Sequence, residues 1–390
     1  MTDMNSTCDY FNIDALLSDE NKLIRQSIRD FVTTEIKPVI DHAAQHHEDI
    51  PNLMLKLGAL GALGPYIPVE YGGAGLDHIA YGIIMQELEA GDSAIRSAAS
   101  VQSSLVMYPI FTFGSEEQKK QYLPKLASGE YIGSFGLTEP NHGSDPAAME
   151  TRLLKKDGQY ILNGAKMWIT NAPICDIAIV WARDEQDKIR GCIVERGMDG
   201  FSTPETLNKW SLRASKTGEL IFQNVAIPAE NILPEVNSLR GPFSCLNSAR
   251  YGISWGAIGA AIDCYQTAVK YALEREQFGK PIASYQLQQK KLAEFLTEIT
   301  KAQLLSWRLG VLKNEGKATP AQISMAKRNN VHMALEIARE SRQILGAMGI
   351  VGDFPMMRHM MNLESVITYE GTHDIHLLLT GNDITGISAF

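Results

Sequence analysis

The sequence contains no pair of cysteines at the short spacing of a metal or redox motif. Its five cysteines are scattered, and their number is odd. Such a set argues against a disulfide framework, because proteins stabilised by disulfides usually carry an even number of cysteines at close spacing. We therefore expect reduced thiols and a cytosol-like compartment.

Positive charge is also in deficit. The 36 lysines and arginines are outnumbered by 45 acidic residues, which gives a formal net charge of −9. Nucleic acid and anionic membranes repel a negative protein, so neither is an expected partner and any anion site must be local.

Long hydrophobic runs are missing too. The most apolar stretch, Tyr251 to Ile262, is too short to span a bilayer, so we expect no transmembrane segment. The first twenty residues contain acidic side chains but no lysine or arginine, unlike a secretory signal or a mitochondrial presequence. This predicts a cytoplasmic protein of bacterial type, and a mitochondrial matrix location would require that a presequence was removed before the first residue. Neither a G-x-G-x-x-G motif nor a Walker A motif occurs, so no Rossmann or P-loop nucleotide site is expected.

What the sequence does contain is a change of periodicity along the chain. Apolar residues at three- and four-residue spacing predict helices up to about Gly129, and β-forming residues with turn signals predict strands up to Pro234. After that the pattern is helical again, with three long segments and a short one following Glu370. We expect an α+β protein with an N-terminal helical domain (residues 1–133), a middle β domain (134–238) and a C-terminal helical bundle (239–390).

The segment Tyr369 to Gly381 places an acid beside an apolar helix. Thr372 to Asp374 favour a helix start, so Glu370 is predicted to lie on the loop just before that helix. A carboxylate there has two interpretations: a surface partner of the helix dipole, or a general base whose pKa is raised by apolar neighbours. His373, Asp374 and His376 also admit a metal-binding interpretation. Because no further ligand cluster is evident, we expect no metal.

Arg96 lies among small residues, in the run I-R-S-A-A-S-V-Q-S-S. Its planar, permanently charged guanidinium suits a carboxylate ligand. A structural salt bridge at a helix end is the alternative.

Two further segments suggest a ligand site in the middle domain. The run from Phe135 to Asp145, F-G-L-T-E-P-N-H-G-S-D, is dense in turn formers, and backbone N–H groups in such a loop can reach a polar ring edge or a phosphate. Trp168, Ile169 and Thr170 are interpreted by default as a core strand.

Together these segments resemble the acyl-CoA dehydrogenases, and among them most closely the glutaryl-CoA dehydrogenases. The resemblance extends from about Leu17 to Phe390. It rests on the runs Y-E-G-T-H-D-I-H, G-L-T-E-P-N-H-G-S-D, K-M-W-I-T-N and R-E-Q-F-G-K-P. His142, Ala347 and Met348 depart from residues common in the family. The resemblance implies an acyl-CoA dehydrogenase-like fold, with a small β-barrel as the middle domain and a four-helix bundle at the C-terminus, and FAD as the cofactor.

The resemblance also implies residue roles. Glu370 would be the catalytic base, with its own backbone N–H and a flavin hydroxyl holding the thioester oxygen. The residues implied to bind the flavin are Phe135, Leu137, Thr138, Gly143, Ser144, Trp168, Ile169, Thr170, Arg275, Phe278, Gln286, Gln343, Leu345, Gly346, Thr372 and Asp374. The residues implied to bind acyl-CoA are Arg96, Ser97, Ser144, Leu246, Asn247, Arg250, Tyr369 and Gly371. For Arg250 a salt bridge within the bundle is an equally open interpretation. The Arg275 and Gln343 segments would act across a subunit boundary, in a homotetramer.

The implied function is the FAD-dependent oxidative decarboxylation of glutaryl-CoA to crotonyl-CoA and carbon dioxide, a step of lysine and tryptophan degradation. Electron-transfer flavoprotein would be the electron acceptor. Three alternatives stay open: a dehydrogenase of another short or branched acyl-CoA without decarboxylation, an oxidase that uses oxygen, and a non-catalytic acyl-CoA or flavoprotein binding partner.

Overall fold

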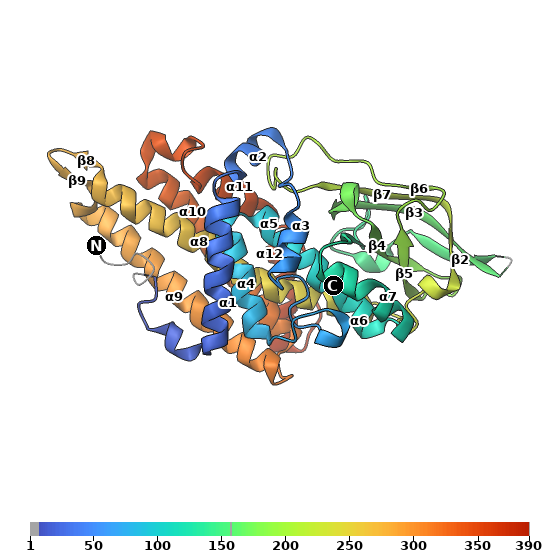
Figure 1. The fold of residues 1–390 in the computed structure, drawn as a ribbon. Coiled ribbons are helices and arrows are strands. Elements are labelled where there is room, and N and C mark those ends of the chain that lie inside the picture. The colour runs from blue at the N-terminus through green and yellow to red at the C-terminus, as the bar shows by residue number, and fades with distance from the viewer. Residues whose placement is uncertain (1–7, 157, 390) are drawn as a thin grey trace.

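The computed structural model describes residues 8–156 and 158–389, which form three consecutive parts (Figure 1). A set of helices is followed by a β-sheet and then by a second helical part that contains the longest helices. The expected order of a helical, a β and a helical part is confirmed.

The N-terminal part is built around one buried helix, α4 (His78–Gly91). Nearly all of its residues are buried, and a helix that is buried on every face must be covered on all sides. Helix α1 (Asp19–Phe31) packs against it and begins at a side-chain cap, because the Ser18 hydroxyl accepts a hydrogen bond from the Asn21 backbone N–H. The other elements are η1 (Ile13–Leu16), η2 (Val32–Ile36), α2 (Ile40–His46), α3 (Leu53–Ala59), η3 (Val69–Tyr71), α5 (Ser93–Ser100), η4 (Val101–Met107), α6 (Tyr108–Phe113) and α7 (Glu116–Ala127).

The middle part is a mixed seven-stranded sheet in the order β1-β4-β2-β3-β7-β6, with β5 paired to β4. Its strands are β1 (Gly133–Gly136), β2 (Arg152–Lys156), β3 (Gln159–Thr170), β4 (Ile177–Arg183), β5 (Ile189–Glu195), β6 (Phe201–Ser202) and β7 (Thr217–Ile227), with short helices η5 (Pro146–Ala148), η6 (Ala172–Ile174) and η7 (Ala229–Asn231). Strands β1, β5 and β6 each pair with a single neighbour, so the ladders of the described strands follow an open path rather than a closed barrel.

The C-terminal part contains the four expected helices and one more. Helices α8 (Arg240–Glu274), α9 (Gln286–Asn314) and α10 (Pro320–Ile344) are long, and α12 (His373–Thr385) follows Glu370. The additional helix α11 (Met356–Val366) packs against α10, α8 and α5. The remaining elements are the β8–β9 hairpin (Glu276–Gln277 and Lys280–Pro281), η8 (Ile282–Ser284) and η9 (Gly346–Ile350).

Helix α8 links the two helical parts by a close approach to α4. A Cβ atom at Gly259 of α8 would lie 1.8 Å from the backbone oxygen of Gln86, so a side chain has no room between the two helices. In Figure 1 the sheet lies at one end of the molecule and the β8–β9 hairpin at the other. Among the described helices, none combines the length and the apolar composition needed to cross a membrane.

Candidate active site

Glu370 lies on the short loop between α11 and α12, in a backbone conformation that few L-residues adopt. Its φ is 54° and that of Gly371 is 94°, both in the left-handed region, which is strained for a residue with a side chain. The Thr372 hydroxyl caps α12 by accepting from the Ile375 backbone N–H. The Nε atom of Arg250 donates to the Glu370 backbone oxygen at 2.7 Å. Glu370 therefore directly precedes a helix, as predicted, and α8 holds its backbone in place.

Glu370 is half-buried, and the Oε2 atom of its carboxyl group is buried without a hydrogen-bond partner among the described residues. Burial raises the pKa of this carboxyl, because its charged form loses hydration, while the positive charges of Arg96, Lys327 and Arg250 oppose the rise. A buried carboxyl with a raised pKa and an unpaired oxygen is suited to accept a proton. The buried Oε2 atom fits this role better than that of a surface partner of the helix dipole.

Arg96 on α5 is completely buried, as is its ion-pair partner Glu89 on α4. Its Nε atom donates to Glu89 Oε2 at 2.6 Å, and its Nη2 atom donates to the hydroxyl of Tyr369, the residue before Glu370. Its Nη1 atom has no partner in the part of the chain that the structure describes. The salt-bridge alternative is thus correct, yet the guanidinium keeps unused N–H donors that could bind an acceptor on a ligand.

A glycine on α8 makes room for the Arg96–Glu89 pair. A Cβ atom at Gly256 would lie 2.0 Å from Glu89 Oε2 and 3.1 Å from Arg96 Nε. Any side chain at this position would displace the carboxylate that orients the arginine.

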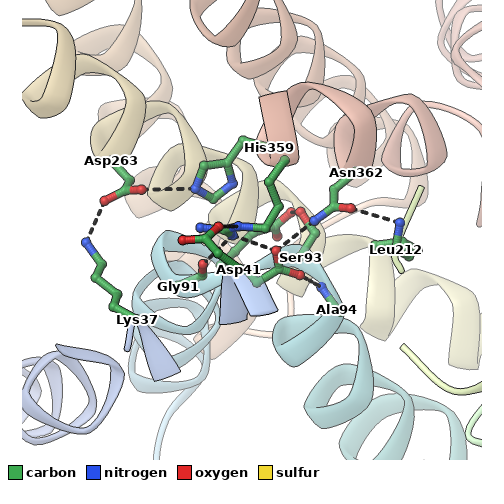
Figure 2. Close-up of polar contacts among 12 residues, drawn as sticks. Lys37, Asp41, Gly91, Ser93, Ala94, Leu212, Asp263, His359 and Asn362 are labelled. Atoms are coloured by element: carbon green, nitrogen blue, oxygen red, sulfur yellow. Dashed lines mark hydrogen bonds and ion pairs between the residues drawn. The ribbon is translucent and has the colours of Figure 1, made fainter. Parts of the chain in front are cut away.

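The start of α5 is held by a buried polar network that comes from α11 (Figure 2). Asp92 caps α5 through Oδ1, which accepts from the Ala94 backbone N–H at 2.6 Å. Its Oδ2 atom accepts from Arg358 Nη1 at 2.6 Å and from Asn362 Nδ2 at 2.8 Å. Because Arg96 lies one helical turn beyond this cap, α11 contributes to its position.

Most other predicted substrate residues lie close to this site. Ser97 is buried on α5, and Leu246 and Asn247 are half-buried on α8, within one turn of Arg250. Arg250 donates from Nη1 to Asn247 Oδ1 at 3.3 Å, and its described contacts are to this amide and to the Glu370 backbone rather than to a carboxylate. Ser144 differs, because it is exposed on the middle-domain loop.

Two residues of this site escaped the sequence analysis, Glu89 and Lys327. Lys327 on α10 is completely buried and donates to the backbone oxygens of Tyr369 and Gly371 at 2.9 Å each. A signal exists for Lys327, since it is a charged position between apolar positions of one helix face, whereas Glu89 has polar neighbours on its own face. Ile323 and Val331, one turn before and after Lys327, are buried. Periodicity shows such a position but not its partner.

The predicted flavin loop is fixed to the end of β3 by a buried ion pair. Lys166 Nζ donates to Glu139 Oε1 at 2.8 Å and to the Leu137 backbone oxygen at 3.1 Å, and both charged side chains are buried. The Met167 backbone N–H donates to the Thr138 oxygen at 2.9 Å. Loop and strand therefore form one rigid surface.

Trp168 and Ile169 on β3 face different environments. Ile169 is buried, as the core interpretation predicts, but the Trp168 side chain is 57% exposed and its φ is 63°. The core interpretation is wrong for Trp168, because the left-handed backbone turns its indole outward, where a planar ring can stack on it. Of the other predicted flavin residues here, Phe135 and Leu137 are buried, Thr138 and Thr170 are half-buried, and Gly143 and Ser144 are exposed.

The remaining predicted flavin residues do not gather at this surface within one chain. Thr372 and Asp374 lie at the start of α12, beside Glu370. Arg275, Phe278 and Gln286 lie at or next to the β8–β9 hairpin, at the end of the molecule opposite the sheet (Figure 1). Gln343, Leu345 and Gly346 lie at the end of α10, where Lys291 near the start of α9 donates to Gln343 Oε1. Phe278 is 95% exposed, whereas Leu345 is buried in the helical core.

The described residues contain one group of three side chains with metal-ligand spacing, Glu139, His142 and Glu150. Glu139 already accepts from Lys166 and from the backbone N–H groups of Glu150 and Thr151, so its oxygens are occupied. His373, Asp374 and His376 do not form such a group.

Comparison with known proteins matches all three parts of the chain. The model of the acyl-CoA dehydrogenase N-terminal domain matches residues 18–130, that of the middle domain residues 134–225, and that of the C-terminal domain residues 242–384. The chain belongs to the acyl-CoA dehydrogenase family. It is 36% identical to an acyl-CoA dehydrogenase of Bacillus subtilis over 95% of this chain and 99% of the relative. It is 35% identical to a glutaryl-CoA dehydrogenase of Desulfococcus multivorans over 96% of this chain and 99% of the relative.

Among solved structures the chain is similar to a glutaryl-CoA dehydrogenase from Mycobacterium smegmatis in complex with FADH2. The TM-score is 0.97 at 46% identity, and the match covers 98% of this chain and 99% of that chain. The acyl-CoA dehydrogenase family depends on FAD, and FAD is the cofactor of this protein. The exposed Trp168 indole beside a rigid loop fits a flavin ring, so the residues present are compatible with the cofactor.

Proposed function

We propose that this acyl-CoA dehydrogenase oxidises glutaryl-CoA and releases carbon dioxide, giving crotonyl-CoA. One observation carries the proposal: a buried carboxyl with a raised pKa, Glu370, lies beside a buried arginine with unused donors, Arg96. A dicarboxylic thioester needs both groups, a base for its α-proton and a cation for its distal carboxylate. An uncharged acyl chain would leave the Arg96 Nη1 atom buried and unpaired, which is unfavourable.

The first step is removal of the α-proton by Glu370. A thioester α-hydrogen is weakly acidic, so the base must be positioned and the developing negative charge on the thioester oxygen must meet hydrogen-bond donors. The backbone N–H of Glu370 is the donor that this chain provides. Bound FAD supplies the acceptor for the β-hydrogen, which leaves as hydride, and a double bond forms between the α and β carbons.

The second step is decarboxylation. The bond to the distal carboxylate breaks, carbon dioxide leaves, and the electron pair is delocalised toward the thioester as a dienolate. Glu370, protonated in the first step, returns its proton to the carbon that lost the carboxyl group, which gives crotonyl-CoA. One residue therefore serves first as base and then as acid.

A second copy of the chain completes the flavin site in this proposal. Trp168 and the loop of Thr138 lie in the sheet at one end of the molecule, while Arg275 and Phe278 lie at the other. A phenylalanine exposed to 95% is unusual on a free surface and fits a contact with a partner chain or its cofactor. A homotetramer would supply this contact, and electron-transfer flavoprotein would take up the electrons of the reduced cofactor.

The test is mass spectrometry of the CoA products after the purified protein is incubated with glutaryl-CoA and an artificial one-electron acceptor. Crotonyl-CoA is the expected product. Glutaconyl-CoA as the sole product would refute decarboxylation, and unchanged glutaryl-CoA would refute the substrate.

A second candidate is oxidation of another short or branched acyl-CoA without decarboxylation. It is favoured by the relative named only as an acyl-CoA dehydrogenase, which is as similar to this chain as the glutaryl-CoA dehydrogenase from Desulfococcus multivorans. A panel of acyl-CoA substrates separates the two candidates, because only the first predicts a preference for a distal carboxylate.

A further inference from the structure

Three consecutive backbone oxygens around Glu370 are each held by a buried cationic side chain. Lys327 Nζ donates to the oxygens of Tyr369 and Gly371, both at 2.9 Å. Arg250 Nε donates to the oxygen of Glu370 between them, at 2.7 Å. The two cations come from α10 and α8, so side chains of both long helices bind the same short loop.

Lys327 is not placed there by an ion pair. The side chain is completely buried, and both of its described hydrogen bonds go to backbone oxygens rather than to a carboxylate. Burial lowers the pKa of this ammonium group to about 7, with the charge of Glu370 acting in the opposite direction. Because burying a cation is unfavourable, its retention at this position calls for a role at the loop itself.

The geometry of the peptide bond connects these contacts to the substrate. No cis peptide bond occurs in the described chain, and in a trans peptide the C=O and the following N–H point in opposite directions. A hydrogen bond that pulls the Tyr369 oxygen toward Lys327 therefore turns the Glu370 N–H away from Lys327. The left-handed φ of Glu370 is strained and would relax without such restraints.

We propose that Lys327 is a positioning residue for the reaction, which aims the Glu370 backbone N–H at the thioester oxygen of the substrate. The inference rests on the proposed chemistry at Glu370 but not on the identity of the acyl chain. An N–H donor stabilises a developing oxyanion only if it is already oriented when the charge appears. Lys327 provides that orientation without touching substrate.

The test uses Lys327→Met, which keeps the length of the side chain and removes its donors and its charge. The control is Lys209→Met, because Lys209 also donates to backbone oxygens, those of Leu212 and Ser215, at 3.1 and 2.6 Å. Burial likewise lowers the pKa of Lys209, to about 8, but the backbone oxygens that it binds are not those of Glu370 or its neighbours. Both variants are purified as FAD-loaded full-length proteins, and their FAD content and melting temperature are recorded.

The first readout is the ionisation of bound acetoacetyl-CoA, which forms an enolate whose negative oxygen needs the same donor as the transition state. In Lys327→Met the ionisation midpoint of the bound acetoacetyl-CoA should rise by about one pH unit or more. With the acyl-CoA that the wild type oxidises, kcat should fall about 10- to 100-fold, while KM changes far less. The control should retain wild-type values. Unchanged ionisation and kcat in FAD-loaded Lys327→Met, or an equal loss in the control, would overturn the proposal.

A second variant, Lys327→Gln, separates positioning from charge. Its amide can still donate to a backbone oxygen, so its kcat should be at least about threefold higher than that of Lys327→Met. An equal kcat in the two variants would assign the effect to charge alone and overturn the positioning role. If Lys327→Met fails to bind FAD, Lys327→Gln is used for the test. Its kcat is then expected to be lower than that of the wild type, and a kcat equal to the wild-type value would refute the proposal. Wild-type protein that oxidises no acyl-CoA would instead refute the proposed function.

Discussion

Removing the Arg96 guanidinium should separate glutaryl-CoA from uncharged substrates of similar length. Nη1 of Arg96 has no hydrogen-bond partner in the described part of the protein, and we expect it to bind the distal carboxylate. Loss of one partner from a buried charged pair costs about 3–5 kcal/mol. Since 1.4 kcal/mol corresponds to a factor of ten, kcat/KM for glutaryl-CoA should fall about 100- to 4,000-fold.

A single Arg96→Met change would confuse this effect with loss of stability. Glu89 is as completely buried as Arg96, and its carboxylate would be left without a counter-ion. The double variant Arg96→Met/Glu89→Gln avoids this, because a glutamine is uncharged and can keep the hydrogen bond that the Ser93 hydroxyl donates to Glu89 Oε1 at 2.7 Å. Its melting temperature should lie close to that of the wild type.

The assay compares kcat/KM for glutaryl-CoA and butyryl-CoA on the plateau of each pH profile. The plateau is needed because the charge of Arg96 opposes the rise in the pKa of Glu370. Without that charge the pKa rises further, and the acidic limb of the profile moves to higher pH for both substrates. We expect the large loss for glutaryl-CoA only. Equal losses for both substrates in a folded, FAD-loaded double variant would show that Arg96 is purely structural.

Three further changes test other parts of the site. Glu370→Gln should abolish exchange of the substrate α-proton while FAD stays bound, and retained exchange would contradict its role as base. The pKa of Glu370 is raised in the folded state, so the contribution of its protonated carboxyl to stability is fully present below the unfolded pKa of 4.5 and is lost as pH rises. Calorimetry should therefore show Glu370→Gln melting at a higher temperature than the wild type near pH 8, and at the same temperature near pH 4. Lys166→Met leaves Glu139 buried without its counter-ion, so it should lower the free energy of unfolding by about 3–5 kcal/mol. It should also reduce the amount of FAD that the protein retains after gel filtration, and unchanged retention would show that the ion pair does not support the cofactor site. Gly256→Ala should displace Glu89 and lower kcat/KM for glutaryl-CoA more than for butyryl-CoA, and an unaffected ratio would contradict the role of that glycine.

Much of the fold could be predicted from the sequence, because its signals are local. Ser18 and Thr372 cap helices as their neighbours predict, since a cap depends on a hydroxyl and a backbone N–H three residues later. The change from helical to strand periodicity separates the β part from the two helical parts. The same kind of local pattern placed Glu370 just before α12. The domain boundaries at residues 133 and 238 stay predictions, as do the roles of the individual site residues.

The partners of the charged residues could not be predicted in this way. The sequence showed Arg96 as a candidate ligand or salt bridge, and the fold makes it a neighbour of Tyr369, 273 residues later in the chain. Lys327 is separated from the loop that it holds by more than one helix, and the exposure of Trp168 depends on a left-handed backbone that its apolar neighbours do not indicate.

The sequence by itself therefore determined the order of the elements, the family motifs and the position of Glu370 just before a helix. Tertiary structure alone decided which charges are buried, which hydrogen-bond donors remain free and which motifs lie too far apart to meet within one chain. The physical reason is range. Capping and periodicity act over a few residues, whereas burial and ion pairing depend on whatever other segments the packed chain brings within a few ångströms.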